Sequence, residues 1–137
     1  MSDNSRFTVA IHILTLIAYC SPKRHTSAYI AGSINTNPVV VRRLLGTLRA
    51  DNLVSSKGGP GGGWQLERPP KKITLGDVFR AFNEAALFPL HPNPPNKKCP
   101  VGKVIQDVLL AHFNDAQSVL EKQLDHTTIA DLVAEVK

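Results

Sequence analysis

The sequence predicts a mainly α-helical protein with one small β-hairpin. Three observations support this class: apolar residues recur at helical spacing over most of the chain, a glycine-rich loop separates two short β-prone segments, and a long amphipathic segment comes near the end. The chain has 137 residues, of which 42% are hydrophobic and 20% charged, as in an ordinary folded domain. We therefore expect one domain with a short appendage.

Three helices are expected in the first fifty residues. Helical spacing of apolar residues predicts one helix from Phe7 to Cys20 and a short one from Ser27 to Ile34. Asn37 can cap a third helix, and Pro38 after it is tolerated as the first helical residue. This helix is expected to run to about Ala50. Its predicted buried stripe is Val41, Leu44, Leu45 and Leu48.

A β-hairpin is expected next. The segments Leu53–Ser56 and Trp64–Glu67 are β-prone, and between them lies Lys57-Gly-Gly-Pro-Gly-Gly-Gly63, a loop composition. A phosphate-cradling nucleotide loop is the alternative interpretation of these glycines. It would need a strand-loop-helix order with Lys-Ser/Thr at the helix start, and the sequence has neither.

The second half begins with a capping-box pattern at Thr74–Asp77, which opens a helix through Phe82. Residues 87–98 contain four prolines and are expected to be irregular. A long helix is then predicted from Val101 to Leu124, about 35 Å at 1.5 Å per residue. This exceeds what a small core can cover, so its apolar stripe is expected to pair with a second copy of the chain.

The chain is thus divided into residues 1–83 and a linker with dimerisation helices, residues 84–137. Its charge divides unevenly too, although the net charge is only +5. Residues 1–72 carry ten basic side chains against three acidic ones, whereas residues 73–137 carry six against eight. A basic part joined to a slightly acidic one is typical of a polyanion-binding module with an attached interaction module.

Helix, turn, helix and hairpin is the order of a winged helix-turn-helix domain. In such a domain the first turn of the second helix faces base edges in the major groove, and the free N–H groups at the start of the preceding helix can take a phosphate. Asn can pair with adenine, Arg with guanine, and Val can touch a thymine methyl group. The candidate DNA contacts are Thr26, Ser27, Asn37, Pro38, Val39, Val40, Arg42, Arg43, Lys57, Gly58, Gly59 and Gly61.

Other classes of protein fit less well. No nucleophile motif, metal-ligand cluster or paired-acid pocket is indicated, so we predict that the chain is not an enzyme. The apolar run from Phe7 to Cys20 is too short to span a bilayer, and Tyr19 stands where a signal-peptide cleavage site needs a small residue. Two cysteines fit a reducing compartment, and we expect a cytoplasmic protein without a membrane partner.

The sequence resembles the Rrf2 family of bacterial transcription regulators over nearly its whole length. Arg6-Phe-Thr-Val-Ala10 resembles the family's opening, Asn37-Pro-Val-Val-Val-Arg-Arg-Leu-Leu45 its recognition helix, and Leu53–Trp64 its wing. Ile73-Thr-Leu-Gly-Asp-Val78 and Thr128-Ile-Ala-Asp-Leu132 resemble its later helices. The resemblance implies a dimeric regulator whose recognition helix reads the major groove and whose wing enters the minor groove.

Departures from the family pattern concern the wing and the cofactor. Gly58 stands where the wing often has Arg, so minor-groove reading would depend on Lys57. Iron–sulfur members have three closely spaced cysteines before the long helix, whereas this chain has Cys99 alone, and Gly102 replaces a histidine ligand. The resemblance therefore implies a cluster-less branch, and we expect no iron–sulfur cluster and no metal.

Two interpretations of Cys99 stay open. At the start of a helix and beside two lysines its thiol is expected to have a lowered pKa, which favours a redox or electrophile switch. A small residue that packs the linker is the simpler interpretation. His91 with Cys99 makes at most half of a metal site.

We conclude from the sequence that the chain is a sequence-specific DNA-binding regulator, with a repressor preferred. It would act as a homodimer on a near-palindromic operator and respond to a thiol reagent or effector through the linker around Cys99. The alternative is a winged-helix protein-interaction module that never touches DNA.

Overall fold

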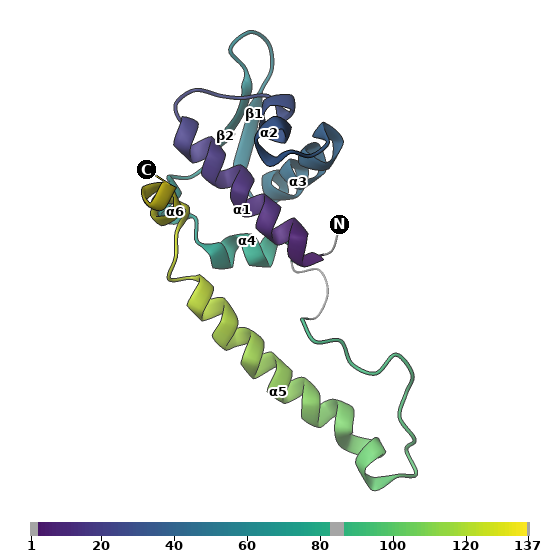
Figure 1. Ribbon diagram of the computed structural model, residues 1–137. Helices are drawn as coiled ribbons and strands as arrows, with labels where there is room; N and C mark the ends of the chain where they lie inside the picture. The colour runs from purple at the N-terminus through teal and green to yellow at the C-terminus, as the bar shows by residue number, and fades with distance from the viewer. Residues whose placement is uncertain (1–2, 83–86, 137) are drawn as a thin grey trace.

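The computed structural model describes residues 3–82 and 87–136, and the helix-turn-helix, hairpin and long helix all lie within them (Figure 1). The elements are α1 (Asp3–Cys20), α2 (Ser27–Ile34), α3 (Pro38–Ala50), β1 (Val54–Lys57), β2 (Gly63–Leu66), a short 3-10 helix η1 (Pro70–Lys72), α4 (Leu75–Phe82), α5 (Pro100–Leu124) and α6 (Ile129–Val136). The predicted class, mainly helical with a hairpin wing and a long late helix, is confirmed.

One apolar core holds the globular part together. α1 crosses its centre and packs against α2, α3, α4, α6 and β2. Each fully buried aliphatic side chain contributes about 1.5–3 kcal/mol relative to an exposed one. The predicted α3 stripe is confirmed, because all four of its residues are buried. The core consists of Ala10, Ile13, Leu14, Ile17, Ile30, Ala31, Val41, Leu44, Leu45, Leu48, Leu53, Val54, Ile73, Val78, Phe82 and Ile129.

The turn between α2 and α3 is fixed by two asparagines. Asn35 ends α2 in the left-handed region, with a φ of 62°, and its N–H donates to carbonyls of the last turn. Asn37 caps α3, since its Oδ1 accepts a hydrogen bond of 2.7 Å from the Val39 N–H. Both helices have the predicted bounds, because each boundary residue carries a strong local signal.

The hairpin pairs β1 and β2 antiparallel, with Ser55 opposite Gln65 and Lys57 opposite Gly63. β1 lies one residue later in the chain than the predicted strand, and β2 lies one residue earlier. β2 packs against α1, whereas β1 packs against α3. The hairpin therefore stands between α1 and α3.

Two capping boxes mark the starts of α4 and α6. The Asp77 carboxylate accepts from the Thr74 N–H, and the Thr74 hydroxyl accepts from the Asp77 N–H; Thr128 and Asp131 repeat this pattern. Ile129 is fully buried, and its N–H donates to the Ile73 carbonyl. α6 thus packs on α1, although the predicted division of the chain places it with the linker and the dimerisation helices in residues 84–137. That division stays a prediction.

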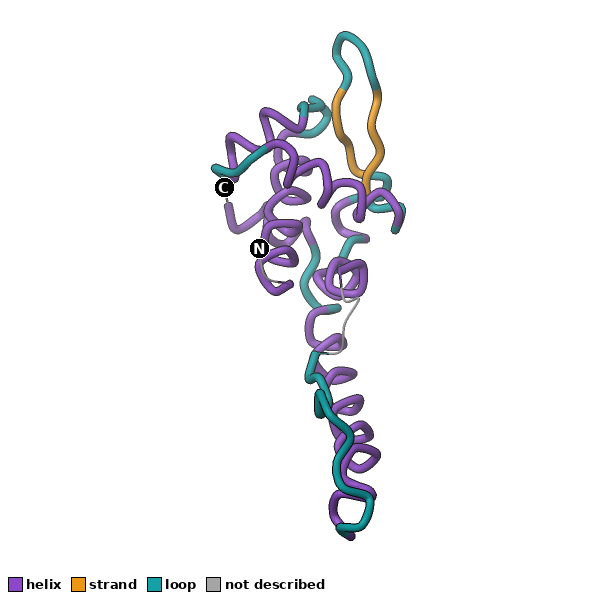
Figure 2. The backbone as a smooth tube through the Cα atoms, turned by 90° about the vertical axis from the view of Figure 1, so that its right-hand side faces the viewer, coloured by secondary structure: helices purple, strands orange, loops and turns teal. Residues whose placement is uncertain are grey.

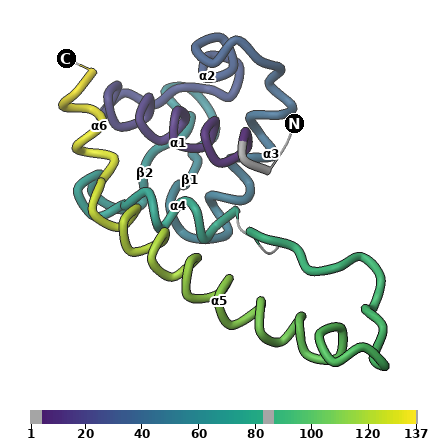
Figure 3. The backbone as a smooth tube through the Cα atoms, turned by 60° about the horizontal axis from the view of Figure 1, so that its bottom comes forward, coloured from purple at the N-terminus to yellow at the C-terminus, as the bar shows by residue number. Residues whose placement is uncertain are grey.

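α5 leaves the globular part at the end opposite to the hairpin (Figure 2). It begins at Pro100, one residue before the predicted start. The segment before it runs outward from the globular part, opposite in direction to α5 (Figure 3). The rings of Phe88 in this segment and Phe113 in α5 lie 5.1 Å apart. No residue of α5 is buried. Among the described helices, α5 included, none is long and apolar enough to cross a bilayer.

Candidate nucleic-acid interface

The first turn of α3 presents an exposed surface. Val39 is 45% exposed and the Arg42 and Arg43 side chains are also exposed, whereas Pro38 and Val40 are half-buried. Because α3 buries Val41, Leu44, Leu45 and Leu48, the residues pointing most directly away from the core are Val39 and Arg43. Arg42 lies two turns before Arg49 on the same side of α3, and Arg49 contacts the ring of Trp64 in the hairpin, so Arg42 lies on the hairpin side of that face.

Asn37 lies at the tip of this turn and is exposed. Its Oδ1 caps the helix, while its Nδ2 amide carries two further donors. Asn37 thus caps the helix with its oxygen and keeps its two Nδ2 N–H donors for a hydrogen-bond acceptor beyond the start of the helix.

The start of α2 offers two hydroxyl groups. The Thr26 Oγ1 accepts from the Tyr29 N–H at 3.2 Å, and the Ser27 Oγ accepts from the Trp64 Nε1–H at 3.1 Å. A hydroxyl that accepts one hydrogen bond still has its O–H to donate. Both groups lie beside the first N–H groups of a helix, and this arrangement favours a phosphate.

The hairpin tip is shaped by glycine. Gly59 and Gly61 have φ angles of 78° and 72°, which other L-residues rarely adopt, and a Cβ at Gly62 would overlap the Lys57 carbonyl oxygen. Lys57, Gly58, Gly59 and Gly61 are all exposed. The tip is therefore narrow, has little side-chain bulk, and carries one positive charge at its base.

The hairpin is fixed against α2 and α3 through Trp64. Its N–H donates to the His25 carbonyl at 3.0 Å, its indole donates to Ser27, and the Arg49 guanidinium lies 5.4 Å from the ring centre. One residue before it, Gly63 has a φ of 134°, and a Cβ there would lie 2.5 Å from the His25 carbonyl oxygen. These contacts tie the wing to both helices of the helix-turn-helix.

Replacing Gly63 with Ala is expected to destabilise the fold by about 1–3 kcal/mol, because the positive φ and the contact with His25 both oppose a Cβ. Urea unfolding measures this change. Gly58→Ala is the matched control, since nothing lies within 4 Å of a Cβ there. Equal stability of the two variants would show that the wing is not held against His25 in this way.

Several residues of this surface were not among the sequence-predicted contacts. Tyr29 is 50% exposed, and its ring stacks on His25 with ring centres 3.8 Å apart. Tyr29 lies off the buried stripe of α2, a signal that could have indicated it. The contacts of Trp64 with Ser27 and Arg49 had no such signal, since they join residues far apart in the sequence.

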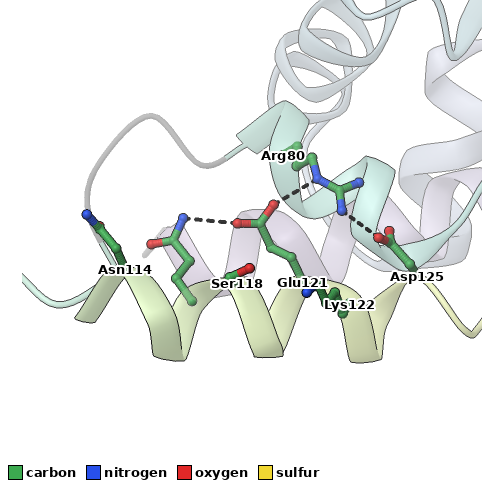
Figure 4. Close-up of a pocket in the computed structure, with 7 residues that line it drawn as sticks. Arg80, Asn114, Ser118, Glu121, Lys122 and Asp125 are labelled. Carbon is green, nitrogen blue, oxygen red and sulfur yellow. Dashed lines mark hydrogen bonds and ion pairs between the residues drawn. The ribbon is translucent and has the colours of Figure 1, made fainter. Parts of the chain in front are cut away.

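A separate polar cluster connects α5 to α4 (Figure 4). Arg80 donates to Glu121 Oε1 at 2.8 Å and to Asp125 Oδ2 at 2.6 Å, and the Thr74 hydroxyl donates to Asp125 Oδ1 at 3.1 Å. The Arg80 guanidinium is the main cause that lowers the pKa of the Asp125 carboxyl, and the Thr74 hydroxyl adds to it. The cluster borders a polar hollow of about 330 Å³ beside Asn114 and Ser118.

Cys99 is exposed and lies at the N-cap position of α5. The backbone N–H groups of Gly102 and then Val101 lower the pKa of its thiol. The cause is thus the start of the helix rather than the neighbouring lysines. Among the described residues, no three His, Cys, Asp or Glu side chains are grouped so that they could hold a metal ion.

Comparison with known proteins agrees with this architecture. The Rrf2 family model, described as iron-dependent transcriptional regulators, matches residues 3–135. YwnA of Bacillus subtilis, a candidate HTH-type transcriptional regulator, is 45% identical over 132 residues, which make up 95% of this chain and 96% of YwnA.

Solved structures have the same fold. A candidate DNA-binding protein, 37% identical, superposes with a TM-score of 0.74 over 93% of this chain and 97% of its own. IscR of T. potens, at 21% identity, does so with a TM-score of 0.72 over 97% of this chain and 86% of its own. These relatives are regulators rather than enzymes. The chain belongs to the Rrf2 family of transcriptional regulators.

Proposed function

We propose that this regulator binds a near-palindromic operator as a cytoplasmic homodimer and represses transcription by occupying it. The observation that carries the proposal is that the first turn of α3, the start of α2 and the glycine-rich hairpin tip present exposed residues on neighbouring elements (Figure 1). Two copies would place their α3 helices in successive major grooves, about 34 Å apart.

The proposed DNA contacts form two groups, those to base edges and those to phosphates. Val39 and Arg43 face outward from α3 and suit base edges, whereas Arg42, Thr26 and Ser27 suit phosphates. Asn37 would use its Nδ2 donors. The hairpin tip, with Gly58, Gly59 and Gly61 but no arginine, would approach the minor groove through its backbone, and Lys57 would contact a phosphate.

The homodimer would form through α5. Valines along this helix are strongly exposed in the single chain: Val101 62%, Val104 48%, Val108 47% and Val119 68%. Their spacing of three, four and eleven residues follows a coiled-coil stripe. An apolar stripe of this length on a folded protein indicates an interface.

The Arg80 cluster would set the distance between the two DNA-reading surfaces, because α4 is the main contact of α5 with the globular part. Arg80→Gln is expected to bind operators whose half-sites are moved by one base pair nearly as well as the original, whereas Arg80→Lys is expected to retain more of the discrimination. Binding to the spacing series measures this. An unchanged spacing preference in Arg80→Gln would contradict the assigned role.

The Asp125 contribution depends on pH in a defined direction. Its pKa is lowered in the folded chain, so the stability that it adds is complete above its ordinary value of 3.8 and is lost as the pH falls through the lowered value. We expect the difference in Tm between wild type and Arg80→Gln to narrow as the pH falls through the lowered pKa of Asp125.

We propose that regulation needs no iron–sulfur cluster, although the family description names iron. Cys99 offers one thiolate, and a cluster normally takes four ligands. At position 102, where cluster-binding relatives have a histidine, a Cβ would overlap the backbone carbonyl oxygen of Asn96. The donor set and this backbone do not fit the group.

Cys99 would instead serve as the sensing thiol. The specific support is its exposure together with the lowered pKa, which increases the reactive thiolate. With iodoacetamide the sulfur forms a bond to carbon and iodide leaves. We expect alkylation to lower operator affinity in the wild type but not in Cys99→Ser. Alkylation without any change in affinity would refute the switch.

The dependence of binding on salt tests the proposal against a winged helix that binds only protein. A protein with six to ten phosphate contacts loses about 10³–10⁵ in affinity between about 50 and 200 mM salt. We expect such a decrease for duplex DNA. Affinity that does not change with salt, or no affinity at all, would favour the protein-interaction module.

A further inference from the structure

A second hollow lies on the other side of the hairpin from α3. It has a volume of about 610 Å³ and is bordered by the end of α1, the segment from Ser21 to Arg24, β2 and the residues that follow β2. Because β2 packs on α1 and β1 packs on α3, this hollow is separate from the recognition surface. Its size is within the range of small-molecule sites.

The lining combines an apolar wall with positive charge. Ile17, Ala18 and Leu66 are buried or half-buried and supply the wall. Lys23 and Arg24 supply two positive charges, whereas Glu67 supplies one negative charge; the guanidinium of Arg68, also in the lining, is paired with Asp77 at 3.6 Å. A ligand complementary to this lining has an apolar body and an anionic group.

Arg24 is held in place before any ligand arrives. Its Nε–H and one terminal N–H both donate to Gln65 Oε1, at 3.0 and 2.6 Å. A guanidinium has five N–H donors, so donors remain for an anion. An arginine that is already oriented loses less conformational entropy on binding a carboxylate.

The same residues connect the hollow to the wing. Gln65 Nε2 donates to Ser55 Oγ across the hairpin at 3.1 Å, and the adjacent Trp64 is bound to His25 and Ser27. A carboxylate bound to the remaining donors of Arg24 would shift the guanidinium together with Gln65, and with them this chain of contacts. The start of α2 and the hairpin base would then shift relative to each other.

We propose that this hollow is a binding site for a small organic carboxylate with an apolar body, and that its occupancy lowers operator affinity through Gln65 and Trp64. The site itself is independent of the DNA-binding function, whereas its effect on affinity rests on that proposed function.

Trp64, the one tryptophan of the sequence, gives a direct readout next to the hollow. We would titrate the 137-residue protein, without DNA, with benzoate up to about 20 mM and follow tryptophan fluorescence. Benzamide removes the charge and acetate removes the apolar body. We expect a saturable change with benzoate that is at least about tenfold weaker with either control ligand.

Variants locate the site. Lys23→Gln and Arg24→Gln are each expected to weaken benzoate about tenfold or more, whereas Lys71→Gln, an exposed cation outside the lining, leaves it unchanged. Thermal melting confirms that each variant is folded; if Arg24→Gln is not, Lys23→Gln decides. Equal responses to all three ligands, no response, or equal losses in Lys71→Gln would overturn the site.

A second arm tests the effect on DNA. Benzoate is expected to lower operator affinity in the wild type but not in Lys23→Gln. If benzoate binds yet operator affinity is unchanged, the coupling is refuted. If the protein binds benzoate but no DNA, the site stands and the proposed function fails.

Discussion

Replacing both Val108 and Val119 with Glu is expected to prevent the proposed dimer from forming and to lower operator affinity by about 10²–10⁴. Both side chains are exposed in the single chain and lie on the apolar stripe of α5. In a paired helix each new carboxylate would be buried without a partner, a cost that the dimer could not offset. A monomer also loses the gain from binding two half-sites through one molecule.

The matched control is Lys103→Glu, which changes the net charge by the same two units at an exposed position of the same helix, on the face away from the valine stripe. Sedimentation velocity gives the oligomeric state, and circular dichroism shows whether helix content is retained. A dimer that persists in the double glutamate variant would show that α5 is not the interface.

Replacing Arg43 with Ala is expected to cost about 1–3 kcal/mol on the preferred operator and much less on a duplex with the contacted guanine changed. Arg43 points away from the buried stripe of α3 together with Val39, so it would enter the groove most deeply. Arg42→Ala is expected to weaken all sequences alike and to reduce the salt slope by about one contact, because Arg42 shares the side of α3 on which Arg49 contacts Trp64 of the hairpin.

Arg43→Lys is the control that separates charge from geometry. Lysine keeps the charge but lacks the planar pair of donors, so a guanine reader should lose most of its discrimination, whereas a phosphate contact should be nearly unaffected. Competition binding against single-base variants of the operator measures both. A uniform loss for Arg43→Ala across all duplexes would reassign it to the phosphate backbone.

Local signals made the helix-turn-helix predictable. Asn37 followed by Pro38 indicated the start of α3, because Asn caps helices and Pro is favoured at their first position. The glycines between Lys57 and Trp64 indicated the hairpin, because glycine adopts the positive φ angles that tight turns require. The two Thr-x-x-Asp patterns predicted two helix starts, because their side chains accept from the first N–H groups of a helix. Such features depend on neighbours within a few residues.

Long-range contacts were not predictable in this way. Arg80 meets Glu121 and Asp125 more than forty residues later in the chain, and nothing in the local pattern of α4 marks it. The packing of Ile129 into the core depends likewise on its bridge to the segment around Thr74. The hollow beside β2 exists only because α1, the segment after it and the hairpin meet in space.

The central claim is specific operator binding by a dimer. The most direct measurement incubates the purified protein with fragmented DNA from its own source at about 150 mM salt and sequences what is retained. We predict a recurring inverted repeat whose half-sites are about one helical turn, or a multiple of it, apart. Retained fragments with no shared sequence, or none above background, would contradict the claim.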